Sequence, residues 1–169
     1  MPVMNDKKRR IIRNAGMVLA AFAGSIFGLI LTIPGYLLDW GPGSGMEGPL
    51  WKVMITGIAS FAAGACAGAF LFRLLAGKLL SDLFSVLVNA FLSLAMMIAS
   101  STAAFITGWV VAYLTGKITG AISGLEWKAV LFYVPLMSCI YSLPVSLVSG
   151  VLFFVFVYIY LRKSNSGVL

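Results

Sequence analysis

Serine and asparagine side chains recur at every fourth position in an apolar stretch near the middle of the chain. They are Ser81, Ser85, Asn89 and Ser93. At about 3.6 residues per turn, this spacing places them on one face of a helix. An asparagine amide is costly in hydrocarbon unless it finds hydrogen-bond partners, so we expect this face to meet protein or a cavity.

A second polar set follows nearer the C-terminus. It comprises Ser138, Ser142, Ser146 and Ser149, with Tyr133 and Tyr141 close by. One interpretation is hydrogen bonding between helices, worth about 0.6 kcal/mol per bond in membranes. The other is a polar pocket lined by both sets. On that second interpretation the candidate solute-binding residues are Asp39, Trp40, Ser85, Asn89, Ser93, Tyr133, Ser138 and Ser142.

Asp39 and Trp40 belong to residues 34–51, which hold five glycines and three prolines. This composition predicts an irregular loop. Its aromatic residues, Tyr36, Trp40 and Trp51, are typical of anchors at the headgroup level of a bilayer. Alternatively, the loop forms a lid whose aromatic rings stack on a ligand and whose glycines allow it to move.

The side-chain inventory gives no support for catalysis. Histidine is absent, and the two cysteines, Cys66 and Cys139, lie in separate apolar runs. No phosphate-binding, metalloprotease or serine-hydrolase motif occurs, and no pair of carboxylates lies within an apolar run. We therefore expect neither an enzyme nor a bound metal or cofactor. The lack of a mid-membrane acid also argues against a proton-coupled pump.

The elements that position these residues must lie in lipid. Only nine of the 145 residues from Met17 to Leu161 are charged, and they separate long apolar runs. This pattern predicts an all-α, multi-pass bundle in contact with a bilayer, forming one domain over residues 1–169. Residues 1–13 are expected to form a basic leader and residues 162–169 a tail.

The distribution of basic residues predicts how the bundle is oriented. Five of the twelve lie in Lys7–Arg13, and the others lie at the ends of apolar runs. This positive-inside pattern places both termini in the cytoplasm, in a plasma or inner membrane. It also favours a membrane-surface role for the basic leader over nucleic-acid binding.

The number of spans depends on two long runs, Leu79–Gly116 and Ala129–Leu161. Each is longer than an ordinary span of about 20 residues. Dividing the first at Ser100–Thr102 and the second near Leu143–Pro144 gives six spans. That division places eleven of the twelve basic residues in the cytoplasm, against nine for four long, broken helices. The sequence therefore favours six spans, with four as the alternative.

Small residues at every fourth position mark two helix faces that allow close approach of another helix. The first face holds Gly16, Ala20, Gly24 and Gly28, and the second holds Thr56, Ser60, Gly64 and Gly68. These faces either pack inside the bundle or dock a partner membrane protein. On the docking interpretation the candidate contact residues are all of these except Thr56.

Several short segments resemble the substrate-binding S-component of energy-coupling-factor vitamin transporters. They are Arg9-Arg10-Ile11-Ile12-Arg13-Asn14-Ala15, the Gly16/Ala20/Gly24 pattern, and the stretch from Ile106-Thr107-Gly108-Trp109 through Thr115-Gly116-Lys117. Six spans in fewer than 200 residues fit the same family. The resemblance implies that Gly16, Ala20 and Gly24 dock a coupling subunit, and that Asp39 and Trp40 cap the solute.

These observations favour a membrane protein that binds a small solute and works in transport with partner subunits. The alternative is a non-catalytic accessory, assembly or interaction subunit that acts through helix–helix contacts.

Overall fold

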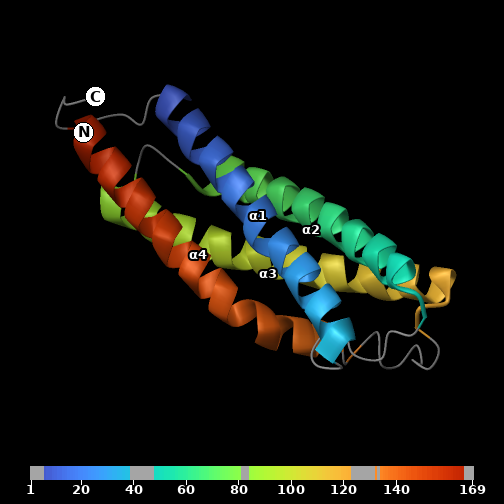
Figure 1. The fold of residues 1–169 in the computed structure, drawn as a ribbon. Helices are drawn as coiled ribbons and strands as arrows, with labels where there is room; N and C mark the ends of the chain where they lie inside the picture. Colours follow the sequence, from blue (N-terminus) through green and yellow to red (C-terminus); the bar gives the residue numbers. More distant parts are fainter. Residues whose placement is uncertain (1–5, 39–47, 81–83, 123–131, 133, 166–169) are drawn as a thin grey trace.

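In the part of the chain that the computed structural model describes, four long helices run up and down beside one another (Figure 1). They are α1 (Asp6–Leu38), α2 (Leu50–Leu79), α3 (Val86–Thr119) and α4 (Val134–Asn165). The structure describes residues 6–38, 48–80, 84–122, 132 and 134–165. The first residues of α1 and the last of α4 lie at one end, where Lys8 Nζ donates a hydrogen bond to the Ser164 carbonyl at 3.4 Å.

The described helices carry many large apolar side chains on the outside, and several polar side chains are buried inside. Val18 on α1, Ile58 on α2 and Leu147 on α4 are exposed, whereas Thr56 and Ser101 are buried. Such a surface suits lipid rather than water. Three helical segments are long and apolar enough to cross a membrane: Leu50–Leu79, Val86–Thr119 and Cys139–Ser164. The all-α prediction is confirmed, and the fold is compatible with a membrane protein.

The predicted division into six helices is wrong, because α3 continues through Ser100–Thr102 without a break. Both serines there form hydrogen bonds within their own helix, Ser100 to the Met96 carbonyl and Ser101 to the Met97 carbonyl. Serine that bonds back in this way leaves the helix intact. With 34 residues, α3 is about 51 Å long, so in a hydrocarbon core of about 30 Å it would have to tilt or extend beyond the core.

Helix α4 also continues through the second predicted division, with Pro144 in its interior. Proline removes one helix hydrogen bond and its ring pushes against the preceding turn, which bends a helix without necessarily ending it. Figure 1 shows α4 changing direction in its first half. The proline therefore marks a bend and not the boundary between two spans.

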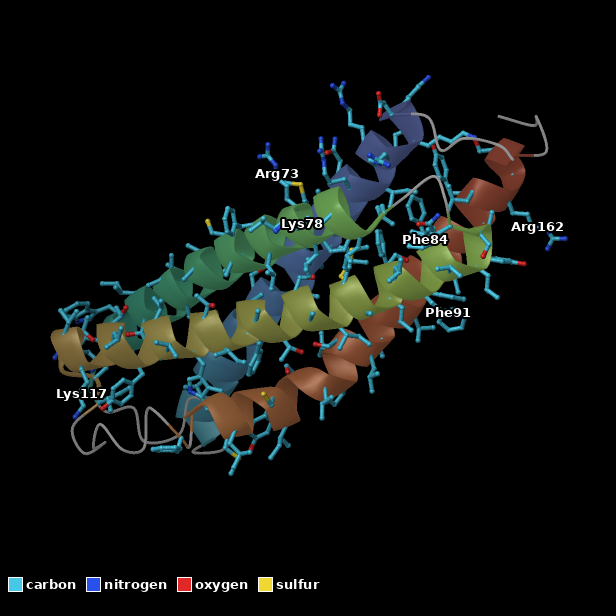
Figure 2. All side chains as sticks on the ribbon, turned by 180° about the vertical axis from the view of Figure 1, so that it is seen from behind. Arg73, Lys78, Phe84, Phe91, Lys117 and Arg162 are labelled. Carbon is cyan, nitrogen blue, oxygen red and sulfur yellow. The ribbon has the colours of Figure 1, made fainter. Side chains whose placement is uncertain are left out.

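The charge argument for six spans failed at Lys117. This residue lies in the last turn of α3, with its Nζ 6.0 Å from the centre of the Tyr113 ring. A cation at a helix C-terminus is favoured by the helix dipole and by an aromatic face, so it needs no cytoplasmic location. Lys117 lies at the opposite end of the bundle from Arg73, Lys78 and Arg162 (Figure 2).

Three segments predicted outside the spans are partly helical in the structure. The basic leader is helical, since α1 begins at Asp6, and lysine and arginine are good helix formers. The predicted loop 34–51 is shorter, because α1 extends to Leu38 and α2 begins at Leu50. At the other end of the chain, α4 extends to Asn165, into the predicted tail.

Small residues bring α1, α2 and α3 into backbone contact. A Cβ atom added to Gly68 would lie 2.7 Å from the Ala20 carbonyl oxygen and 3.0 Å from the Ala104 Cβ. One added to Gly108 would lie 3.1 Å from the Ser60 carbonyl oxygen. Such contacts are possible only between small residues, and they are a main source of helix association in lipid.

A cluster of large side chains joins all four helices near the end that holds the termini. Phe72 of α2 is fully buried over Gly16 of α1, and its ring meets the Phe153 ring of α4 edge-on at 5.3 Å. Met96 and Met97 of α3 complete the contact. The aromatic pair therefore attaches α4 to the three helices that the small residues hold together.

We expect Gly68→Ala to lower the free energy of unfolding by about 1–3 kcal/mol, because the new methyl group would press on the Ala20 backbone. The matched control is Gly77→Ala on the same helix, where an added Cβ meets no atom within 4 Å. That control should be neutral or stabilising by up to about 1 kcal/mol. Thermal unfolding of the purified protein in detergent measures both. Equal stability of the two variants would contradict the packing described here.

Candidate functional site

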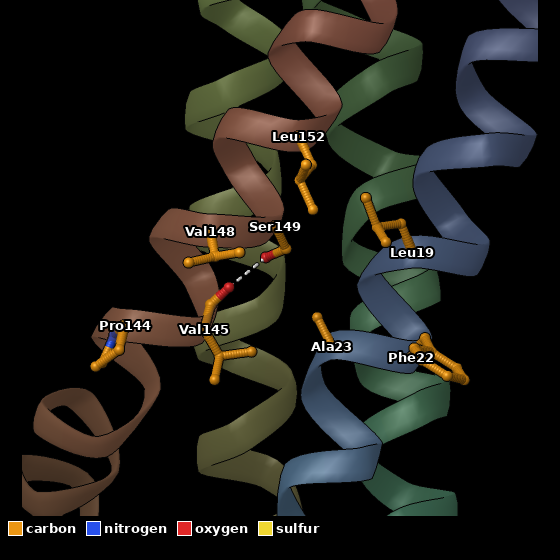
Figure 3. Close-up of a pocket in the computed structure, with 8 residues that line it drawn as sticks. All are labelled: Leu19, Phe22, Ala23, Pro144, Val145, Val148, Ser149 and Leu152. Carbon is orange, nitrogen blue, oxygen red and sulfur yellow. Dashed lines mark hydrogen bonds between the residues drawn. The ribbon is translucent and has the colours of Figure 1, made fainter.

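An apolar groove runs between α1 and α4, and it is the candidate site (Figure 3). One part has a volume of about 500 Å³ and is lined by Leu19, Phe22, Ala23, Pro144, Val145, Val148, Ser149 and Leu152. The adjoining part, of about 600 Å³, is lined by Asn14, Ala15, Val18, Leu19, Phe22, Leu152, Phe153 and Phe156. The two parts share Leu19, Phe22 and Leu152, so they form one elongated groove.

The bend of α4 accounts for the position of the groove. Beyond the bend, the second half of α4 meets α1 and α2 through Phe153, and Lys8 and Ser164 join the ends of the two helices. Around Pro144, the helix lies apart from α1, with Val148 and Ala23 on facing walls (Figure 3). The groove is therefore closed by side chains at the end that holds the termini and open along its length.

The chemistry of the groove favours an apolar ligand. Its polar side chain nearest the bend, Ser149, donates its hydroxyl to the Val145 carbonyl at 2.7 Å, so that proton is engaged within α4. The facing residues Phe22 and Leu152 are exposed and hydrophobic. Ligand sites typically measure about 300–1,000 Å³ and have mainly apolar walls, and the groove matches both properties.

The polar set predicted on α3 has local structural roles. Ser85 caps the helix, its Oγ accepting a hydrogen bond from the Val88 amide. The Asn89 amide donates to the Phe84 carbonyl at 3.3 Å, and Ser93 donates to the Ala90 carbonyl at 2.7 Å. These bonds satisfy buried polar groups at the start of α3.

The polar set on α4 lies far from the set on α3. Ser142 donates to the Cys139 carbonyl at 3.1 Å, near the Trp109–Tyr141 ring pair, whereas Asn89 lies near the Phe91–Phe154 pair. Because Thr102 of α3 pairs with Ser146 of α4, Ser142 lies at about the level of residue 106 on α3. From residue 89 to residue 106, α3 rises by about 25 Å. The structure therefore does not bring the two sets into one pocket. Between them, Thr102 and Ser146 form a hydrogen bond across the helices at 3.3 Å.

The remaining candidate solute-binding residues fall where the structure gives no side-chain surroundings. Ser138 lies within α4, but its side chain is outside the described part. Asp39, Trp40 and Tyr133 lie outside the described residues altogether. Their proposed part in binding stays a prediction.

The predicted partner-docking face is used within the chain. Gly16, Ala20, Ser60, Gly64 and Gly68 are all buried between helices, so in this fold they are not free to receive another protein. Their burial supports the internal-packing interpretation, because small residues allow the chain's own helices to approach closely, and the docking of a partner stays a prediction. Gly24 and Gly28 lie in α1, with their surroundings outside the described part.

Sequence reasoning missed the groove because its walls carry no polar signature. Leu19, Phe22, Val148 and Leu152 have the composition of any lipid-facing helix surface. The available signal was Pro144, whose position inside an apolar run can indicate a bend as well as a boundary.

Fold and groove together define an all-α bundle of long apolar helices with an apolar recess on one side. Comparison of the chain with protein-family models, with curated proteins and with solved structures gives no match.

We expect Asn89→Ala to lower the free energy of unfolding by about 1–2 kcal/mol, since it removes a hydrogen bond that tethers the start of α3. Ser93→Ala is the matched control, because its hydroxyl bonds only to the adjacent turn, and alanine is the better helix former. Thermal unfolding in detergent compares the two. Unchanged stability of Asn89→Ala together with lost solute binding would favour the polar-pocket interpretation instead.

Proposed function

We propose that this chain is an integral membrane protein that binds a lipophilic small molecule in the α1–α4 groove and serves its transport together with partner subunits. The observation that carries this proposal is the elongated apolar groove, whose larger part measures about 600 Å³. The walls of this groove can pack against an apolar chain by van der Waals contact, and they offer few groups to orient a polar one.

The charge distribution supports an orientation with both termini in the cytoplasm. Arg13, Arg73 and Arg162 lie at the end that holds the termini, whereas Lys52 and Lys117 lie at the other. Basic residues near the ends of spans favour the cytoplasmic side. The apolar groove between these two ends is then at the depth of the hydrocarbon.

The need for partner subunits follows from the chemistry of the chain. Its sequence contains no G-x-x-x-x-G-K-[ST] motif for nucleotide binding and no acidic residue in the middle of an apolar run. Energy for directed movement would therefore come from another subunit.

A second candidate is an interaction subunit that receives a partner's transmembrane helix in the same groove. The observation in its favour is the length of the α1 wall, which extends from Asn14 to Ala23, more than two helical turns. A helix occupant would bury this wall continuously, whereas a small molecule would contact one part of it.

The test is a groove-filling substitution, Ala23→Phe, in protein reconstituted into lipid nanodiscs. A long-chain fatty acid with a photoreactive diazirine serves as the probe, and mass spectrometry maps the labelled peptides. We expect labelling of the peptides that contain Leu19 and Leu152 to fall several-fold, because the new ring occupies the groove. Ala62→Phe, at an exposed position on α2, is the matched control and should leave labelling unchanged.

Equal labelling of the two variants would contradict the proposal, since lipid would then touch the groove no differently from any other surface. If Ala23→Phe instead releases a copurifying membrane protein while labelling stays the same, the groove receives a helix and the second candidate holds.

A further inference from the structure

A second cavity, chemically unlike the groove, lies between α1 and α2 at the end that holds the termini. Its volume is about 310 Å³, and its lining residues are Arg13, Phe70, Arg73, Leu74, Gly77 and Lys78. Three of the six are cations, contributed by two helices. Figure 2 shows Arg73 and Lys78 on the last turns of α2. We call this the basic cavity.

The floor of the basic cavity is the backbone of α2 itself. A Cβ atom added to Gly77 would meet no atom within 4 Å, so no neighbouring side chain fills the space above this residue. Gly77 is part of a regular helix, and its backbone does not require glycine. The missing side chain therefore creates room beside the cations rather than relieving strain.

Arg13 gives an independent indication of a ligand. Its Nε atom is buried and has no hydrogen-bond partner among the described residues. A buried donor without an acceptor is unfavourable, and for a charged group the cost is larger still. The described residues that line the cavity include no carboxylate, so a bound anion would supply an acceptor that the lining side chains do not provide.

We propose that the basic cavity binds a phosphate group. Two guanidinium groups and an ammonium group can together surround the oxygens of a phosphate, and arginine suits it especially because its planar fork donates two parallel hydrogen bonds. Phe70 and Leu74 are exposed beside the cations and would contact the apolar part of an anionic phospholipid. The same cations would equally accept a free phosphate ester from the cytoplasm, so the source of the phosphate is a matter for experiment.

Gly77→Leu is the first test variant, since a leucine there fills the cavity without striking the fold. Gly77→Ala is its matched control and leaves most of the cavity open. Arg73→Gln is the second test variant, removing one cation that lines the cavity. Its control is Arg162→Gln, which makes the same charge change at an exposed position on α4, outside the cavity.

Two measurements separate the lipid from the free phosphate. Native mass spectrometry of the detergent-purified protein follows binding of phosphatidylglycerol, and the thermal shift caused by millimolar inorganic phosphate follows the free anion. Binding of phosphatidylglycerol that is weakened roughly tenfold by both test variants, with both controls unchanged, identifies a lipid headgroup site. A phosphate-induced shift that both test variants lose, without any effect on lipid, identifies a site for a soluble ester.

Two results would overturn the proposal. In the first, both test variants bind lipid and phosphate as the unmodified protein does. In the second, Arg162→Gln weakens binding as much as Arg73→Gln, which would mean that net charge and not the cavity attracts the anion. Neither result bears on the groove between α1 and α4, which lies on a different side of α1.

Discussion

The close approach of α1, α2 and α3 at Gly68 is the contact on which the rest of the bundle depends. Gly68 rests against the Ala20 backbone and the Ala104 side chain, without room for even a methyl group. In lipid, association between helices gains little from the hydrophobic effect, so tight van der Waals contact must supply the stability. These three helices therefore form a compact group in which buried polar side chains bond within their own helices.

Helix α4 is attached to this group through larger side chains, and it packs extensively along α3 but only to a small extent against α1. The Phe153 ring meets Phe72 edge-on, the Phe154 ring meets Phe91 at a tilt, and Ile98 lies in the space beside Gly150. The bend at Pro144 directs the first part of the helix away from α1. The groove results from the packing of α4 along α3 and from the bend at Pro144. Because α4 stays beside α3, it separates from α1 near the bend.

The sequence predicted the helical class, the lipid-facing surface and the small-residue faces, because each of these depends on local composition and spacing. It could not predict how the faces pair, so the face containing Gly16 and the face containing Gly68 were each compatible with docking or with internal packing. The sequence also did not predict the number of helices. Ser100–Thr102 and Pro144 look like interruptions locally, and only the packing around them keeps α3 and α4 continuous.

The continuity of α3 is the claim on which the four-helix fold depends, and one distance tests it. Spin labels at the exposed positions Leu87 and Ile118, introduced after the exposed Cys66 and Cys139 are replaced by serine, report the length of α3 by double electron–electron resonance. A continuous helix places the two backbones about 46 Å apart, at about 1.5 Å per residue. A hairpin at Ser100–Thr102 would bring them to within roughly 20 Å, since packed helices lie about 8–10 Å apart, and that result would contradict the four-helix account.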